Sequence, residues 1–328
     1  MSDLTTTYMG IPLTSPIVVA ACSISGMIDK VRLAEQAGAG ALVIRSLFEE
    51  QIQVDAMRLE ESLQVGAESY AEARSYFPDV RPGMAGDHLH WIEKTRKAVG
   101  MPLIASLNAA TAGGWVRFTR QLEATGVSGL ELNIYAVAAD PRREAGEIEQ
   151  ELLDIVGAVR SETTLPLAVK LSPFYTSVSH VAHALDGLGV DALVLFNRFV
   201  QPDIDPTSES LLTEMVLSTP DELRLPLRWT ALLYGRMRAD IALNTGVHSG
   251  LDAAKALLAG AQVVQTASAL LQHGIPYLST MLRQLEGWMG EHGYARLAEF
   301  RGKLSQKESP DPFAYERAQY VRLLSAQK

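Results

Sequence analysis

Residues 185–198, LDGLGVDALVLFNR, run from the end of a helix through a glycine-containing turn into a short apolar segment that ends in polar residues. The same order recurs at three other places in the chain. These are AEQAGAGALVIRS (34–46), LEATGVSGLELNIY (122–135) and LLAGAQVVQTAS (257–268). Helices that alternate with short, almost entirely apolar strands indicate strand–helix units and a parallel sheet covered on both faces.

Four further apolar segments bring the number of predicted strands to eight. They are PIVVAA (16–21), PLIASLN (102–108), PLAVKLS (166–172) and IALNTGV (241–247). Amphipathic segments at 111–126, 146–160 and 276–292 supply helices between strands. Eight units without a break favour an α/β fold of the (β/α)8, or TIM-barrel, type. An open doubly wound sheet is the alternative, but AACSIS stands after the first strand where a dinucleotide fold has G-x-G-x-x-G.

Length and composition favour a single domain over residues 1–328. The chain is 47% hydrophobic and 20% charged, and it contains no long linker rich in Pro, Gly or Ser. We expect the barrel core to cover about residues 8–304 and a polar tail to cover 305–328.

Two connections exceed ordinary loop length, at roughly residues 47–88 after the second strand and 199–228 after the sixth. Loops this long in a compact domain are usually functional or disordered. The second connection contains QPDIDPT and STPDELRLP, which we interpret as turns.

The net charge of −9 argues against a nucleic-acid partner, because binding a polyanion needs clustered Lys and Arg. The first ten residues, MSDLTTTYMG, lack the basic start and apolar stretch of a secretory signal. The sequence also has no run of about 18 apolar residues, the length that could span a membrane. We therefore expect a cytoplasmic protein.

The sequence offers no motif for a metal site. Its one cysteine, Cys22, cannot form an internal disulfide or hold an iron–sulfur cluster by itself. His88 and His90 in DHLHW are two residues apart, which places them on different faces of a helix, and no H-E-x-x-H motif accompanies them. We interpret this segment as the solvated start of a helix.

Polar residues collect at the carboxyl ends of the predicted strands, where a TIM barrel builds its active site. They are Cys22, Ser23, Arg45, Ser46, Asn108, Asn133, Tyr135, Lys170, Ser172, Asn197, Thr245, Gly246 and Ser268. Any one Asn could simply cap a helix or a turn. Several together indicate a bound polar molecule, because burying a lone ammonium or amide costs several kcal/mol. The small-residue turns NTGVHSG and TASALLQHG are typical of phosphate sites, so the set describes a planar polar ring with a phosphate tail.

The segments PIVVAA, GAGALVIRS, ELNI, AVKLSP, NTGVHSGLDAAKALLAGAQVVQTASAL and GYARLAEFRGKLS occur in an order and spacing that suggest a known family. From about residue 8 to 304 the sequence resembles the soluble dihydroorotate dehydrogenases, which are FMN-dependent (β/α)8 barrels, and a dihydroorotate dehydrogenase-like group of bacterial proteins. The resemblance implies an oxidoreductase of pyrimidine biosynthesis in which a CH–CH substrate passes hydride to flavin N5. It also implies a homodimer and leaves open a separate iron–sulfur partner that collects the electrons.

The resemblance assigns roles to individual residues. Lys170 would lie beside N1 and the C2 carbonyl of the flavin and stabilise the charge that reduction places there. Asn133 and Asn197 would orient ring or substrate. The cofactor-binding set would be completed by Ala20, Ala21, Arg45, Ser46 and Asn108 around the ring and by Gly246, Val247, Ala267 and Ser268 at the phosphate. Arg45 stands where the family usually has lysine, which keeps the charge and changes the shape.

Three departures from the family pattern bear on catalysis. The catalytic base, a cysteine or serine three residues after the asparagine of the ELN motif, falls on Ala136, which cannot accept a proton. The asparagine expected after the second strand has no counterpart, since residues 47–100 contain no Asn. The paired glycines after the sixth strand are replaced by DELRLPLRW, in which we expect Arg224 or Arg228 to hold the phosphate instead.

A replacement for the base can be sought among nearby residues. Tyr135 shares a strand face with Asn133 and is the first candidate, although an aromatic residue could equally close the top of the barrel. Cys22 and Ser172 are further candidates.

Two other functions compete with the oxidoreductase. Lys170 could form a Schiff base in an aldolase-type barrel enzyme, which would be colourless and would trap substrate with borohydride. A flavin-binding protein without catalytic activity would also explain the loss of the base.

Overall fold

The computed structural model describes residues 2–48, 84–109, 115–134, 137–198, 201–214 and 216–316. Within these ranges, eight parallel strands close into a barrel, because the last barrel strand, β12, pairs with the first, β3, as well as with β11. In their order around the barrel the strands are β3 (Ile17–Val19), β4 (Ala41–Phe48), β5 (Leu103–Ala109), β6 (Gly129–Ile134), β7 (Leu167–Leu171), β8 (Ala192–Leu195), β11 (Asp240–Asn244) and β12 (Val263–Thr266). All eight predicted strands are present, and the predicted TIM barrel is confirmed.

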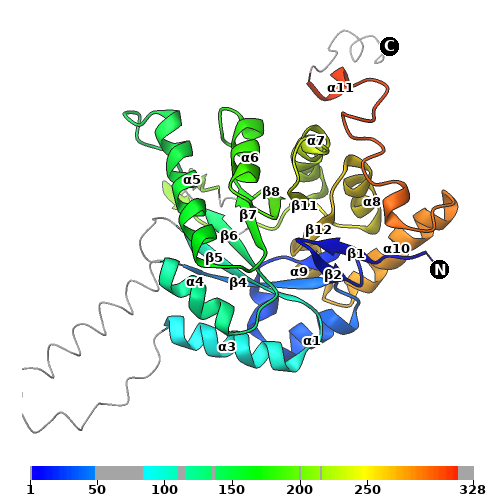
Figure 1. Cartoon of the computed structure of the whole chain (residues 1–328), viewed down its shortest axis with the longest axis horizontal. Helices are drawn as coiled ribbons and strands as arrows, with labels where there is room; N and C mark the ends of the chain where they lie inside the picture. The colour runs from blue at the N-terminus through cyan, green and yellow to red at the C-terminus, as the bar shows by residue number, and fades with distance from the viewer. Residues whose placement is uncertain are drawn as a thin grey trace, which may run out of the picture.

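Helices alternate with these strands and cover the outside of the barrel (Figure 1). They are α1 (Ile28–Gln36), α3 (Met84–Ala98), α4 (Trp115–Ala124), α5 (Ala145–Glu162), α6 (Val178–Gly187), α7 (Arg224–Leu233), α8 (Gly250–Ala259), α9 (Ser268–His273) and α10 (Tyr277–Glu291). A short helix, α11 (Phe313–Glu316), lies near the carboxyl end of the described chain. The apolar outward faces of the strands and the inner faces of the helices form one large buried cluster.

The inside of the barrel holds a second apolar cluster. Its strand residues are Val18, Ala41, Val43, Ile104, Ala168, Ala192, Val194, Ala242 and Val263. A hairpin of β1 (Thr6–Tyr8) and β2 (Ile11–Leu13) adds Tyr8, Met9 and Leu13 to this cluster. The Met9 N–H donates to Asp240, the first residue of β11, at 2.8 Å. The hairpin therefore closes the amino-terminal end of the barrel.

The inward positions become polar toward the carboxyl ends of the strands. Side chains alternate along a strand, so the next inward residue after Ala168 is Lys170, and the next after Val263 is Gln265. In the described barrel interior the polar positions therefore lie at the carboxyl end, whereas the other end is filled by apolar packing.

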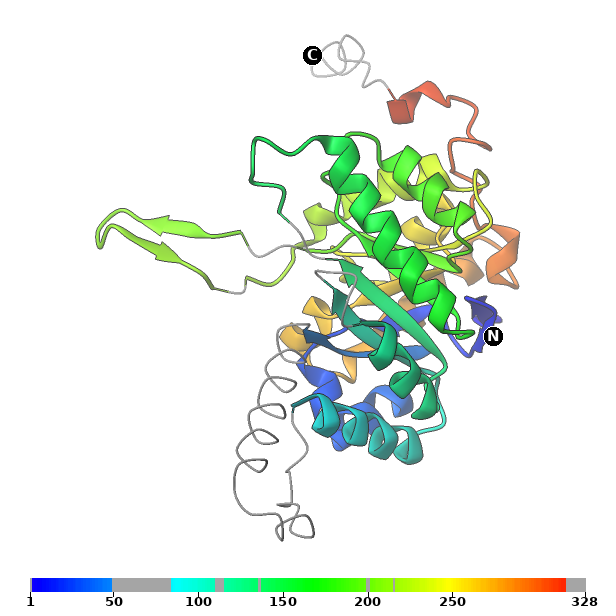
Figure 2. The ribbon, with the colours of Figure 1, turned by 60° about the vertical axis from the view of Figure 1, so that its left-hand side comes forward.

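The structure describes the second long connection almost completely but little of the first. Most of the first, residues 49–83, lies outside the described residues, and α3 begins at Met84. In the second, β9 (Asp203–Asp205) and β10 (Ser210–Leu212) form an antiparallel hairpin that projects from the barrel (Figure 2). The prediction of turns is wrong for STPDELRLP. Thr219 and Glu222 form a capping box there, which starts the 3-10 helix η3 (Pro220–Leu223), and α7 follows directly.

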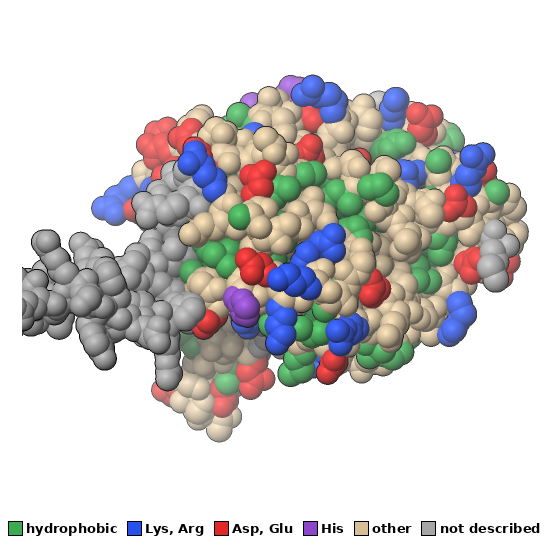
Figure 3. Space-filling model, turned by 60° about the horizontal axis from the view of Figure 1, so that its bottom comes forward, with side chains coloured by type: hydrophobic (Ala, Val, Ile, Leu, Met, Phe, Trp, Pro, Cys, Tyr) green, Lys and Arg blue, Asp and Glu red, His purple; other side chains and the backbone are tan. Residues whose placement is uncertain are grey.

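Acidic, basic and apolar side chains are interspersed on the molecular face shown in Figure 3. On this face no broad area carries a single sign of charge. Among the described helices, none combines the length with the apolar character that crossing a membrane would require.

Helix α8 provides a simple stability test. The Ser249 hydroxyl accepts a hydrogen bond from the Asp252 N–H at 3.2 Å and caps the helix. We expect Ser249→Ala to lower the free energy of unfolding by about 1 kcal/mol in urea titrations, because it removes this cap. Ser179→Ala, at an exposed position inside α6, is the control and should be neutral or slightly stabilising. Equal effects of the two substitutions would contradict the capping role.

Candidate active site

A cavity of about 310 Å³ lies at the carboxyl ends of the barrel strands. Its wall combines Lys170 of β7 with residues that follow β3, β8, β11 and β12. Eight of the predicted cofactor residues line it: Ala20, Ala21, Lys170, Asn197, Gly246, Val247, Ala267 and Ser268. The structure therefore brings together residues that are up to 248 positions apart in the sequence, from Ala20 to Ser268.

Lys170 is buried and paired with a carboxylate inside the barrel. Its Nζ lies 3.6 Å from Oε1 of Glu131, whose side chain is 1% exposed. The other carboxylate oxygen, Oε2, accepts a hydrogen bond from Nε2 of Gln265 at 2.6 Å. The ion pair with Glu131 thus positions the amine, and the hydrogen bond from Gln265 positions Glu131.

Glu131 and Gln265 were missed by sequence reasoning. Both lie one inward position below the strand ends, in segments that otherwise read as buried and apolar. The available signal was strand alternation, because Glu131 shares a face with Asn133. Charged residues are almost never fully buried without a partner, so a glutamate at an inward position of a strand predicts one nearby.

The asparagines split between the cavity and its surroundings. Asn197 lines the cavity, and its Nδ2 donates to Oδ1 of Asn133 at 2.8 Å. Asn133 and its neighbour in the sheet, Asn108, are half-buried and are not part of the described cavity wall. Asn133 therefore orients Asn197 in this structure, whereas Asn108 has no described role at the cavity.

The end of the cavity near β11 and β12 is built from tight turns. Thr245 and Gly246 both have positive φ, at 79° and 77°. A Cβ on Gly246 would lie 2.2 Å from the backbone nitrogen of Leu223, so only glycine fits here. The Ser268 hydroxyl accepts from the Ser218 N–H at 3.0 Å and ties the start of α9 to the long connection.

The cation near this end is Arg198, which directly follows Asn197 and lines the cavity. Its guanidinium pairs with Glu222 at 2.8 Å. The expectation for Arg224 and Arg228 is wrong. Arg224 pairs with Asp221 in an exposed position, and Arg228 donates to the Tyr315 carbonyl, because α7 turns both side chains toward the outside of the barrel.

The chemistry of the cavity wall fits a phosphate-bearing flavin. Among the described lining residues, Lys170 and Arg198 are cationic and none is Asp or Glu. The Gly246 turn leaves backbone where a side chain would otherwise stand. Both properties favour an anionic ligand that approaches the backbone closely.

Arg45 and Ser46 line a neighbouring cavity of about 680 Å³ instead. The two cavities share Ala21, Cys22 and Ser23. Arg45 and Ser46 therefore line a different cavity from the eight predicted cofactor residues named above.

Of the candidate bases, the structure describes Ser172 and Cys22 but not Tyr135. Tyr135 and Ala136 lie outside the described residues. The Ser172 hydroxyl accepts a hydrogen bond from the Phe174 N–H at 3.1 Å, and burial raises the pKa of the Cys22 thiol. Neither Ser172 nor Cys22 is therefore well suited to accept a proton at neutral pH.

The predicted helix start around His88 is confirmed, but its prediction as solvated is wrong for His88. α3 does begin there, but the side chain of His88 is only 5% exposed, whereas that of His90 is exposed. His88 lines the second cavity together with Arg45.

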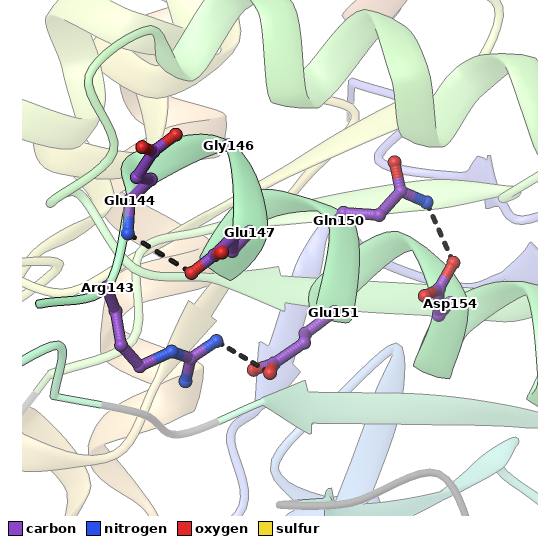
Figure 4. A pocket seen from close by; sticks show the side chains of 7 residues that line it. All are labelled: Arg143, Glu144, Gly146, Glu147, Gln150, Glu151 and Asp154. Atoms are coloured by element: carbon purple, nitrogen blue, oxygen red, sulfur yellow. Dashed lines mark hydrogen bonds and ion pairs between the residues drawn. The ribbon is translucent and has the colours of Figure 1, made fainter.

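A third hollow, at the start of α5, is a surface feature (Figure 4). Arg143 pairs with Glu151 at 2.6 Å, and the Glu144 N–H donates to Glu147 at 3.2 Å. Four of its lining residues are acidic and one is basic, so the hollow would repel a phosphate.

The barrel, the polar strand ends and the buried lysine agree with a comparison of the sequence with known families. A sequence model of the dihydroorotate dehydrogenase family matches residues 82–289, more than half of the chain. The chain belongs to the dihydroorotate dehydrogenase family. It is thus an oxidoreductase of the group that acts on CH–CH bonds.

Curated relatives cover much of the chain. The catalytic subunit of dihydroorotate dehydrogenase B (NAD(+)) from Thermoplasma volcanium is 27% identical over 312 residues, which is 92% of this chain and 98% of the relative. The subunit of the same name from Pelobacter propionicus is 31% identical over 220 residues, or 63% of this chain and 69% of the relative. The chloroplastic dihydropyrimidine dehydrogenase (NADP(+)) of Arabidopsis thaliana is 24% identical over 206 residues, or 57% of this chain and 48% of the relative.

Proposed function

We propose that this chain is an FMN-dependent oxidoreductase that oxidises a CH–CH group of a dihydroorotate-like ring in pyrimidine biosynthesis. The observation that carries the proposal is the position of Lys170, a buried cation on the wall of a cavity whose described lining contains no carboxylate. FMN, when bound, supplies a two-electron acceptor whose ring carries additional negative charge after reduction. Lys170 stabilises this charge, and Glu131 and Gln265 fix the position of its amine.

The remaining residues hold the two ends of the ligand. Asn197, oriented by Asn133, offers hydrogen bonds to the ring or to the substrate. At the phosphate end, the turn at Gly246 and the start of α9 at Ser268 supply backbone N–H groups, and Arg198 supplies charge. Because Arg45 and Ser46 line the second cavity, we infer a contact with the substrate for them in place of the predicted contact with the cofactor.

The proposal extends to partners and location. Two of the relatives are catalytic subunits by name, which supports a separate electron-transfer partner for this chain. A homodimer and a cytoplasmic location follow from the family resemblance and the acidic composition, and we assign the whole of residues 1–328 to one domain.

The absorbance spectrum of the purified protein tests the cofactor. We expect a yellow protein whose released chromophore has the mass of FMN, and anaerobic addition of dihydroorotate or dihydrouracil should bleach the flavin absorbance. A colourless protein that does not take up added FMN would contradict the proposal, and borohydride trapping on Lys170 would then favour the aldolase alternative. Bound flavin that resists reduction would favour the non-catalytic flavin-binding protein.

A further inference from the structure

His88 is a buried histidine whose Nε2 atom lacks a hydrogen-bond partner. It lies early in α3 and is 5% exposed, and its Nε2 atom makes no hydrogen bond. An unpaired buried polar atom costs about 1–3 kcal/mol, so its presence in a folded protein needs an explanation. A ligand that bonds to Nε2 during function would explain it.

The cavity that His88 lines is a neighbour of the cofactor cavity. The two share Ala21, Cys22 and Ser23, and the second cavity adds Arg45, Ser46, Trp91 and His88. Trp91 is one helical turn after His88, and its indole N–H donates to the Ser25 carbonyl at 2.9 Å, which fixes α3 against the segment after β3. A molecule that spans the two cavities would therefore pass the shared residues Ala21, Cys22 and Ser23 before it contacts His88.

Oxidation of a CH–CH group requires a proton acceptor as well as a hydride acceptor. The family position for this group is occupied by Ala136, and the described alternatives, Cys22 and Ser172, are poorly suited. His88 differs from them in having a ring nitrogen, Nε2, that is buried without a hydrogen bond, on a residue that lines a cavity large enough for a substrate.

We propose that the second cavity receives the part of the substrate that loses a proton, and that Nε2 of His88 accepts this proton. The inference rests on the proposed function, because it needs the bound flavin as the oxidant. One substrate C–H bond breaks and its electron pair leaves as hydride to that oxidant. The adjacent C–H bond breaks, its electron pair forms the C=C bond, and its proton forms the N–H bond of an imidazolium at His88, which later releases the proton to solvent.

The charges around His88 suit this role. Burial, with a smaller contribution from the Arg45 guanidinium, lowers the pKa of His88 to about 4, so the ring is neutral and able to accept a proton at pH 7. The ionisable side chains that line the same cavity are Arg45 of β4, Asp87 of α3 and Cys22. A substrate carboxylate that pairs with Arg45 would offset the positive charge and make the ring a stronger base when substrate is bound.

The state of His88 can be measured without a substrate. We expect an NMR titration of the FMN-loaded protein to show one of its seven histidines, identified by its absence in His88→Gln, with a pKa near 4. Arg45→Met should raise this value toward the ordinary one of about 6.5. A value that Arg45→Met leaves unchanged would show that Arg45 and His88 do not act on the same cavity, and it would overturn the inference.

The catalytic role is tested by the rate at which dihydroorotate or dihydrouracil bleaches the bound flavin without oxygen. We expect His88→Gln to keep the flavin spectrum and to reduce the rate by about 10²- to 10⁴-fold. Added imidazole should restore part of the rate in His88→Ala, which a purely structural role would not allow. His90→Gln, exposed on the same helix, is the matched control and should react at the original rate.

The outcomes separate this inference from the proposed function. If the unaltered protein is reduced and His88→Gln is reduced equally fast, the inference alone is overturned. If neither compound reduces the unaltered protein, the proposed function fails and the role of His88 fails with it.

Discussion

Replacing Lys170 with methionine is expected to remove most of the bound FMN and to lower the free energy of unfolding by about 3–5 kcal/mol. The structure gives two separate reasons. Lys170 is one of two cations in the described lining of the cofactor cavity, so its loss weakens the attraction for an anionic cofactor. It is also the cationic partner of Glu131, at 3.6 Å, and methionine would leave that carboxylate buried and uncompensated.

A double variant separates the two effects. Glu131→Gln removes the buried charge while an amide oxygen can still accept the hydrogen bond from Gln265. The combination Lys170→Met with Glu131→Gln should therefore recover much of the stability in urea titrations. Its affinity for FMN, measured by fluorescence quenching of the free flavin, should stay low. Recovery of FMN binding together with stability would show that Lys170 acts only as a structural partner of Glu131.

The fold could be predicted from the sequence because its signal repeats. Each strand–helix unit carries the same change from a helical pattern to an apolar run, and the residues at the end of each run are adjacent in space once the strands are parallel. Lys170 and Gly246 were found on this basis, since both stand at the carboxyl ends of strands.

The residues that were missed depend on packing between units. Glu131 looks like part of a buried strand, and only the closed barrel brings it to Lys170 and Gln265. His88 looked solvated because helical spacing tells which residues share a face and not which face meets the barrel. The same limit applies to the expected phosphate ligands in α7, whose side chains point away from the cavity, while Arg198 reaches it from the end of the preceding strand segment.

Gly246→Ala should be the most disruptive single methyl addition at the cofactor cavity, and Gly189→Ala provides its control. Both glycines have φ of 77°, so alanine meets the same backbone strain at each, about 1–2 kcal/mol. A Cβ at Gly189 would meet nothing within 4 Å, whereas at Gly246 it would lie 2.2 Å from the backbone nitrogen of Leu223.

The clash at Gly246 cannot be relieved by rotating a side chain, because the opposing atoms belong to the backbone of η3. We therefore expect Gly246→Ala to cost about 1–3 kcal/mol more than Gly189→Ala in urea unfolding of the FMN-free protein. It should also reduce the stabilisation that added FMN provides, since a ligand stabilises a protein only to the extent that it binds the folded state. If added FMN stabilises both variants equally, the turn at Gly246 is not part of the cofactor site, and the phosphate must be held elsewhere.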